Sequence, residues 1–164
     1  MYEDVMSQIK DRTVQALEDI KTHTTRMFEE QTQSAQARIK TIVDNAKSEI
    51  SRIPADFDQK LEESKKIHKE AIKNVKTFEK ESIALLKDLW QSTKIKLQEM
   101  CKDTANMGAG SFVTTMTKDI ITNTNALLDK LIAMIKSCAA SAVKNLDEYL
   151  KGISGGATSS KDKA

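Results

Sequence analysis

Residues that break helices are almost absent from this chain, and their scarcity restricts the possible folds more than any other feature. One proline and five glycines occur in 164 residues. Sheet-based folds need a turn about every ten residues, so a sandwich, a barrel or a doubly wound sheet is excluded. The breakers lie at Pro54, at Gly108 and Gly110, and from Gly152 onward. The sequence therefore predicts an all-α protein with a few very long helices.

The spacing of these breakers predicts how the chain is organised. We expect helical stretches at about residues 3–52, 56–106 and 111–151, and the first two would each measure roughly 75–80 Å if unbroken. Residues 122–125 are typical of helix ends, so the third stretch has a candidate interruption. We expect one domain over residues 1–151, an elongated antiparallel bundle of three to five amphipathic helices. Residues 152–164 are predicted to form a flexible polar tail.

Apolar residues recur every eleven residues along much of the chain. The first column is apolar at eight consecutive steps: Met6, Leu17, Phe28, Ile39, Ile50, Leu61, Ile72 and Ile83. A second column is apolar at seven of nine steps: Ile9, Ile20, Gln31, Ile42, Ile53, Ser64, Val75, Leu86 and Leu97. The apolar members of both columns, together with Trp90, are called the apolar stripe. Eleven residues in three turns approach a relaxed helix, so the stripe runs nearly straight and suits a lipid surface or a neighbouring helix.

The columns stay in phase across Pro54, which leaves alternatives for this segment. Either the helix passes through with a kink, or two helices lie end to end on one surface, or Pro54 marks an ordinary helix start. Lysines such as Lys65 and Lys76 border the stripe. They either extend toward lipid headgroups or are solvated and pair with acids such as Glu62.

The third helical stretch has a different pattern. Its apolar residues follow a spacing of three, four and seven: Leu128, Leu131, Ile135, Cys138, Ala142 and Tyr149. Four further apolar residues widen this face: Leu127, Ile132, Ala139 and Leu146. We expect this helix to lack the eleven-residue phase and, as the most apolar stretch, to form the packing centre of the bundle.

The eleven-residue columns from Met6 to Ile83, the proline in phase within them, the lysine-rich edge and the scarcity of glycine resemble the exchangeable apolipoproteins. Insect apolipophorin III is the type most similar in size, and perilipin-like and phasin-like coat proteins share the pattern. The resemblance covers about the first hundred residues. It implies an amphipathic helix bundle that opens on a lipid surface and turns its core toward the lipid.

No catalytic or ligand-binding motif is recognisable. The two histidines, His23 and His68, are far apart in the sequence, and neither they nor Cys101 and Cys138 show the spacing of metal ligands. We therefore expect no enzyme activity, no metal and no cofactor. With 26 basic and 24 acidic residues the chain is close to neutral, so a nucleic-acid partner is not expected.

Individual residues keep two interpretations each. His68 is expected to be satisfied by a neighbouring side chain, with a pH-responsive trigger as the alternative. Trp90 is either a core residue or a lipid anchor. Cys101 and Cys138 are expected to be free thiols, because a turn near Ala109 places Cys101 opposite about residue 117 and far from Cys138.

These observations predict reversible lipid-surface binding or lipid transport, at a lipoprotein, a droplet or a membrane leaflet. The alternative is a structural protein whose helices form an oligomer, rod or coat with copies of the chain or with a partner. A membrane-inserting toxin that uses residues 105–143 is a third interpretation. No signal peptide or membrane span is recognisable, so we expect either a cytoplasmic protein at a lipid surface or a secreted mature chain.

Overall fold

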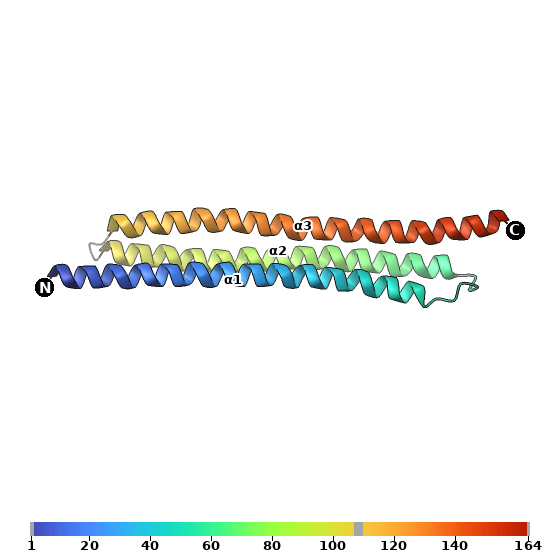
Figure 1. The fold of residues 1–164 in the computed structure, drawn as a ribbon, viewed down its shortest axis with the longest axis horizontal. Helices are drawn as coiled ribbons and strands as arrows, with labels where there is room; N and C mark the ends of the chain where they lie inside the picture. The colour runs from blue at the N-terminus through green and yellow to red at the C-terminus, as the bar shows by residue number, and fades with distance from the viewer. Residues whose placement is uncertain (1, 107–109, 164) are drawn as a thin grey trace. The chain divides into compact units, whose positions relative to one another are not determined.

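Over the residues that the structure describes, the protein is a bundle of three long α-helices (Figure 1). The computed structural model describes the backbone of residues 2–106 and 110–163, without the side chains of residues 2, 6, 104–110 and 155–163. Within these residues it contains no strand, and α1 spans Tyr2–Ser51, α2 Lys60–Asn106 and α3 Gly110–Lys163. The predicted all-α bundle of three to five helices is confirmed, with three. The expected breaker Gly108, the neighbouring Ala109 and the Met6 side chain lie outside the described residues.

The chain leaves the helix before Pro54, so the alternative in which one helix runs through the proline is excluded. α1 ends at Ser51 and α2 begins only at Lys60. Proline has no amide to donate and disfavours a helical conformation in the residue before it, which ends α1 at this point. The connection has its own bonds, since the Phe57 amide donates to the Pro54 carbonyl at 3.1 Å and Lys60 Nζ donates to the Ile53 carbonyl at 3.0 Å.

α3 is longer and more regular than the composition predicts. It continues without interruption through residues 122–125 and extends to Lys163, so residues 152–163 are helical where we expected a flexible tail. Thr124 is buried on the inner face of α3, and this packing outweighs the weak helix propensity of the Thr-Asn pairs. The segment after Gly152 contains no proline, so every amide there can join the helical ladder.

Contacts divide the chain into two compact units. Unit 1 comprises Met1–Gln31 and Ala84–Ile132, and unit 2 comprises Thr32–Ile83 and Ala133–Ala164. Each unit therefore contains one segment of every helix. We expected one bundle domain over residues 1–151, and that single domain stays a prediction.

Successive helices are antiparallel within the units, as predicted. In unit 2, Gln36 and Lys47 of α1 pair with Cys138 and Tyr149 of α3, each pair 102 positions apart, so α1 and α3 run parallel. α2 runs opposite to both. In unit 1, α2 and α3 are antiparallel, because Trp90 bonds to Asn125 and, further along α2, Cys101 contacts Thr114.

The buried face of every helix follows the eleven-residue repeat. On α3 three columns point inward, and the central one consists of the buried residues Val113, Thr124, Ile135 and Leu146. The prediction that this helix lacks the repeat is therefore wrong. Of the residues expected on the apolar face, Cys138 and Tyr149 are only half-buried, whereas Ala139 and Leu146 are buried. Leu and Ile are frequent on α3, so several registers match its sequence and packing selects one.

Candidate functional site

The candidate site is the apolar stripe, and on α1 its first column forms the centre of the buried face. Leu17, Phe28, Ile39 and Ile50 are at most 1% exposed. Members of the second column on this helix lie at the edge of the buried face, since Ile9, Ile20 and Ile42 are half-buried. The eleven-residue spacing therefore identifies the inward side of α1 correctly.

On α2 the centre of the buried face moves to the second column. Ser64, Val75, Leu86 and Leu97 are at most 1% exposed. The first column falls to the edge, where Leu61 and Ile72 are half-buried and Ile83 is 9% exposed. The columns keep their phase across Pro54, but they do not form one continuous surface. The chain reverses between α1 and α2, and each helix turns a different column toward its neighbours. Ile53 lies in this connection and is half-buried.

The column bordering the stripe also changes its environment between the two helices. On α1 it contributes Thr32 and Val43 to the core, although Lys10 and Lys21 of the same column are exposed. On α2 the same column supplies Lys65, Lys76 and Lys87, all exposed. The burial of Thr32 and Val43 was not predicted from the sequence. Their uncharged side chains in a column of lysines were the feature that could have predicted it.

Small and polar residues interrupt the buried face. Among the described side chains, five polar residues are buried, and they come from all three helices: Thr24, Thr32, Ser64, Thr117 and Thr124. The Ser64 and Thr117 hydroxyl oxygens have no hydrogen-bond partner among the described residues. Since a buried hydroxyl without a partner costs about 1–3 kcal/mol, these positions lower the stability of the closed bundle. Sequence reasoning missed them because it followed apolar residues only.

Trp90 is a core residue of unit 1. It is 6% exposed, and its indole Nε1 donates to Asn125 Oδ1. Its ring meets that of Phe28 edge-on, with centroids 6.3 Å apart and an interplanar angle of 85°. A tryptophan with its polar atom bonded and its ring packed is a fixed part of the closed bundle. Its emission therefore reports on opening.

His68 is satisfied by a neighbour, as expected. Its Nε2 lies 2.7 Å from Asp147 Oδ1 across the contact between α2 and α3 in unit 2, and its side chain is 15% exposed. His68 belongs to the same eleven-residue column as Trp90. This column therefore contributes a polar contact in unit 2 and an aromatic contact in unit 1. The pH-responsive trigger stays a prediction.

Both cysteines are free thiols, as expected. Cys101 Sγ lies 3.6 Å from Thr114 Oγ1, close to the predicted position opposite residue 117. Cys138 Sγ faces the Gln36 carbonyl at 3.9 Å, and burial raises the pKa of the Cys138 thiol.

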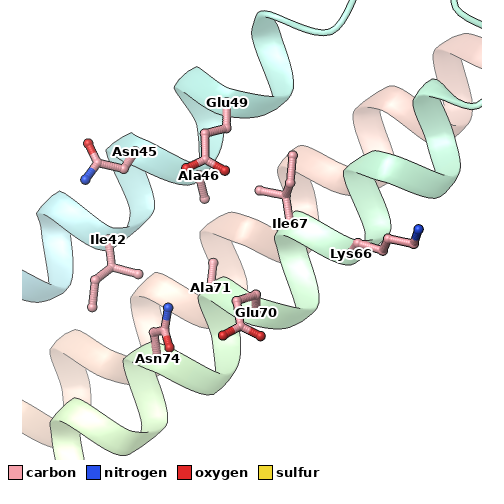
Figure 2. A pocket seen from close by; sticks show the side chains of 9 residues that line it. All are labelled: Ile42, Asn45, Ala46, Glu49, Lys66, Ile67, Glu70, Ala71 and Asn74. Atoms are coloured by element: carbon pink, nitrogen blue, oxygen red, sulfur yellow. The ribbon is translucent and has the colours of Figure 1, made fainter.

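Two grooves flank α1 in unit 2. The groove between α1 and α2 measures about 500 Å³, and the Ala46 and Ala71 side chains leave it open (Figure 2). Glu49, Glu70 and Lys66 also line this groove. The groove between α1 and α3 measures about 440 Å³ and includes Val43 and Cys138. Buried alanines line both grooves, Ala46 and Ala71 in the first and Ala142 in the second.

Other chemistry is not visible in the part of the chain that the structure describes. Those residues include no group of three or more His, Cys, Asp or Glu side chains arranged to hold a metal ion. No window within the described helices has the hydropathy of a membrane-spanning segment.

Comparisons with known proteins find no relative. No protein-family model matches the chain, and neither a curated protein nor a solved structure matches it.

Proposed function

We propose that this protein binds lipid surfaces reversibly, through a bundle that opens and presents its apolar stripe to the lipid. The observation that carries the proposal is the burial of the eleven-residue columns, with Leu17, Phe28, Ile39 and Ile50 on α1 and Val75, Leu86 and Leu97 on α2. A straight apolar face of this kind fits a flat lipid surface as well as it fits neighbouring helices.

The closed bundle keeps this face hidden, so lipid binding requires opening. In the part of the chain whose side chains are described, the exposed large apolar residues are few and come from separate segments: Val5, Phe57, Leu85, Ile95, Phe112 and Met134. Phe112 is also covered on one side by Lys10, whose Nζ lies 4.4 Å from the ring centroid. Scattered apolar residues are normal on protein surfaces, and the six described residues do not follow one another along a helix face as an extended apolar patch would.

Opening exchanges one set of apolar contacts for another. Each buried apolar side chain is worth roughly 1.5–3 kcal/mol whether it faces a helix or acyl chains, so the closed and lipid-bound states lie close in free energy. The unpartnered hydroxyls of Ser64 and Thr117 reduce the stability of the closed state further. The helices themselves need not change, since the connection at residues 52–59 provides a hinge between α1 and α2.

A titration with phospholipid vesicles tests the proposal. We expect the protein to float with the vesicles and the Trp90 emission to change as its contacts with Phe28 and Asn125 are lost, while helicity stays level or rises. The variant Ile39→Ser/Ile50→Ser/Ile72→Ser should bind lipid more weakly and also form a less stable bundle, because Ile39 and Ile50 are buried. Leu85→Ser/Ile95→Ser is the matched control on exposed apolar residues.

The outcomes separate the two classes of function. Lipid binding that survives the triple substitution, or that is lost in the exposed control instead, contradicts a mechanism of opening. Absence of flotation at a large excess of lipid contradicts the function itself. A concentration-dependent mass in solution, together with indifference to lipid, would then favour an oligomeric rod or coat.

A further inference from the structure

We propose that four exposed lysines on α2 bind the anionic headgroups of a lipid surface. These residues, called the lysine stripe, are Lys69, Lys73, Lys76 and Lys80, and all belong to unit 2. This inference rests on the proposed function and names the class of lipid: a leaflet that carries negatively charged headgroups.

The spacing of the lysine stripe follows the same repeat as the core. Its members are four, three and four positions apart and complete one eleven-residue repeat. At 1.5 Å per residue they extend over about 16 Å of helix, and the 3.67-residue period keeps them on one line. The four lysines are exposed, whereas Ala71 and Val75 between them in the sequence are buried. The lysine stripe therefore lies on the side of α2 that faces away from the core.

The four lysines of the stripe form no ion pair among the described residues. The ion pairs of this region are Lys65 with Glu62 at 3.7 Å and Lys66 with Glu63 at 3.4 Å, and no described carboxylate lies within 4.0 Å of the four lysines. Two nearby acids are placed elsewhere, since Glu70 lines the groove toward α1 and Glu79 shares the inward column of His68.

Like charges three and four positions apart repel one another along a helix. The lysine stripe contains three such neighbouring pairs, so its charge works against the helix in solution. An anionic surface removes this repulsion and adds attraction at each lysine. Charge complementarity therefore favours an anionic partner over a neutral one.

Apolar neighbours favour a lipid leaflet among anionic partners. The half-buried Ile72 is three positions from Lys69 and four from Lys76, and Ile83 is three positions from Lys80. The stems of Lys69, Lys76 and Lys80 can lie along these side chains while the ammonium groups reach the headgroups. Nucleic acid would use the charges but not the apolar border.

The lysine stripe is accessible before any opening. Docking on headgroups therefore needs no loss of core contacts, and it is weakened by salt because the charges are exposed. It brings the protein to the surface, where the apolar stripe then exchanges its contacts.

Flotation with two vesicle compositions tests the lysine stripe. Vesicles of phosphatidylcholine alone are compared with vesicles that also contain phosphatidylserine. We expect the wild type to bind the second kind more tightly, and the variant Lys69→Gln/Lys73→Gln/Lys76→Gln/Lys80→Gln to lose this preference. At about fivefold per lysine the combined loss is about 10²- to 10³-fold. The corresponding Arg variant should restore binding.

A control of equal charge distinguishes the lysine stripe from net charge. Lys21, Lys96, Lys118 and Lys130 are exposed and lie outside the stripe, so their change to Gln should have a much smaller effect. Equal losses in both variants, or wild-type binding by the stripe variant, would overturn the inference. Duplex DNA that competes for the protein as strongly as vesicles containing phosphatidylserine would also overturn the inference. If the wild type and the stripe variant bind both vesicle types equally well, the inference is overturned but the proposed function is not. If the wild type binds neither vesicle type, the proposed function is overturned as well.

Discussion

At the scale of single residues, the buried hydroxyls are the weak positions of this bundle. Thr117 is 3% exposed and Ser64 is fully buried, and neither oxygen has a partner among the described residues. By contrast, Thr13 Oγ1 donates to the Ile9 carbonyl at 2.9 Å. An unpartnered hydroxyl lowers stability by the cost of its lost hydration, which an apolar side chain of the same shape does not have.

Thr117→Val should therefore stabilise the protein by about 1–2 kcal/mol, as measured by urea denaturation followed by circular dichroism. Thr13→Val is the matched control and should give no gain, because its hydroxyl is already bonded. If opening is the route to lipid, the Thr117 variant should also bind vesicles more slowly. A lower stability of Thr117→Val than of the wild type would show that its hydroxyl finds a partner in solution.

Cys138 provides a second test at this scale. Burial raises the pKa of its thiol, which lowers the fraction of reactive thiolate at a given pH. In a Cys101→Ser background, alkylation of Cys138 should be slow in solution and should accelerate when vesicles are added, because opening returns the thiol to water. The rate in solution should still be rising at pH values where an exposed thiol is fully ionised. An unchanged rate on vesicles would mean that the α1–α3 contact around Cys138 stays closed on lipid.

At the scale of the helix, orientation rather than hydrophobicity distinguishes neighbouring residues. Leu86 lies in the central column of α2 and is 1% exposed, whereas the adjacent Leu85 is 46% exposed. The two side chains are identical and point to different sides of the same helix. Their difference therefore measures the orientation of α2 alone.

Leu86→Ala should destabilise the protein by about 2–4 kcal/mol, and Leu85→Ala by less than about 1 kcal/mol. The measurement is the free energy of unfolding by denaturant for both variants and the wild type. Similar losses at the two positions would mean that α2 is rotated from the orientation described above.

At the scale of the whole molecule, the two units have unequal cores. All five buried alanines of the described residues belong to unit 2: Ala35, Ala46, Ala71, Ala139 and Ala142. Unit 1 instead buries the aromatic pair Phe28 and Trp90. Since buried apolar area sets most of the contact free energy, we expect unit 2 to have the weaker core. Unit 2 also contains the lysine stripe.

Unit 2 should therefore open before unit 1 when lipid is added. Hydrogen exchange read by mass spectrometry compares segments of one helix, such as residues 13–28 and 35–50 of α1, and the second segment should exchange faster in solution. On vesicles the difference should first increase. Equal exchange of the two segments under both conditions would contradict this order.

The long helices and the inward side of α1 could be predicted from the sequence. Both depend on local properties, namely the scarcity of proline and glycine and the eleven-residue period of Leu17, Phe28, Ile39 and Ile50. Local backbone bonding requires no knowledge of distant residues, so such predictions succeed. The eleven-residue period of apolar residues also identified the members of the apolar stripe.

The orientation of α2 and α3 depended on residues far away in the chain. Pro54 ends α1, and the reversal that follows moves the buried centre from the column of Leu61 to that of Ser64. The bond between His68 and Asp147 joins positions 79 residues apart, and no local period encodes it. A helix with apolar residues on several sides offers more than one inward face, and the choice is made by the packing of its neighbours.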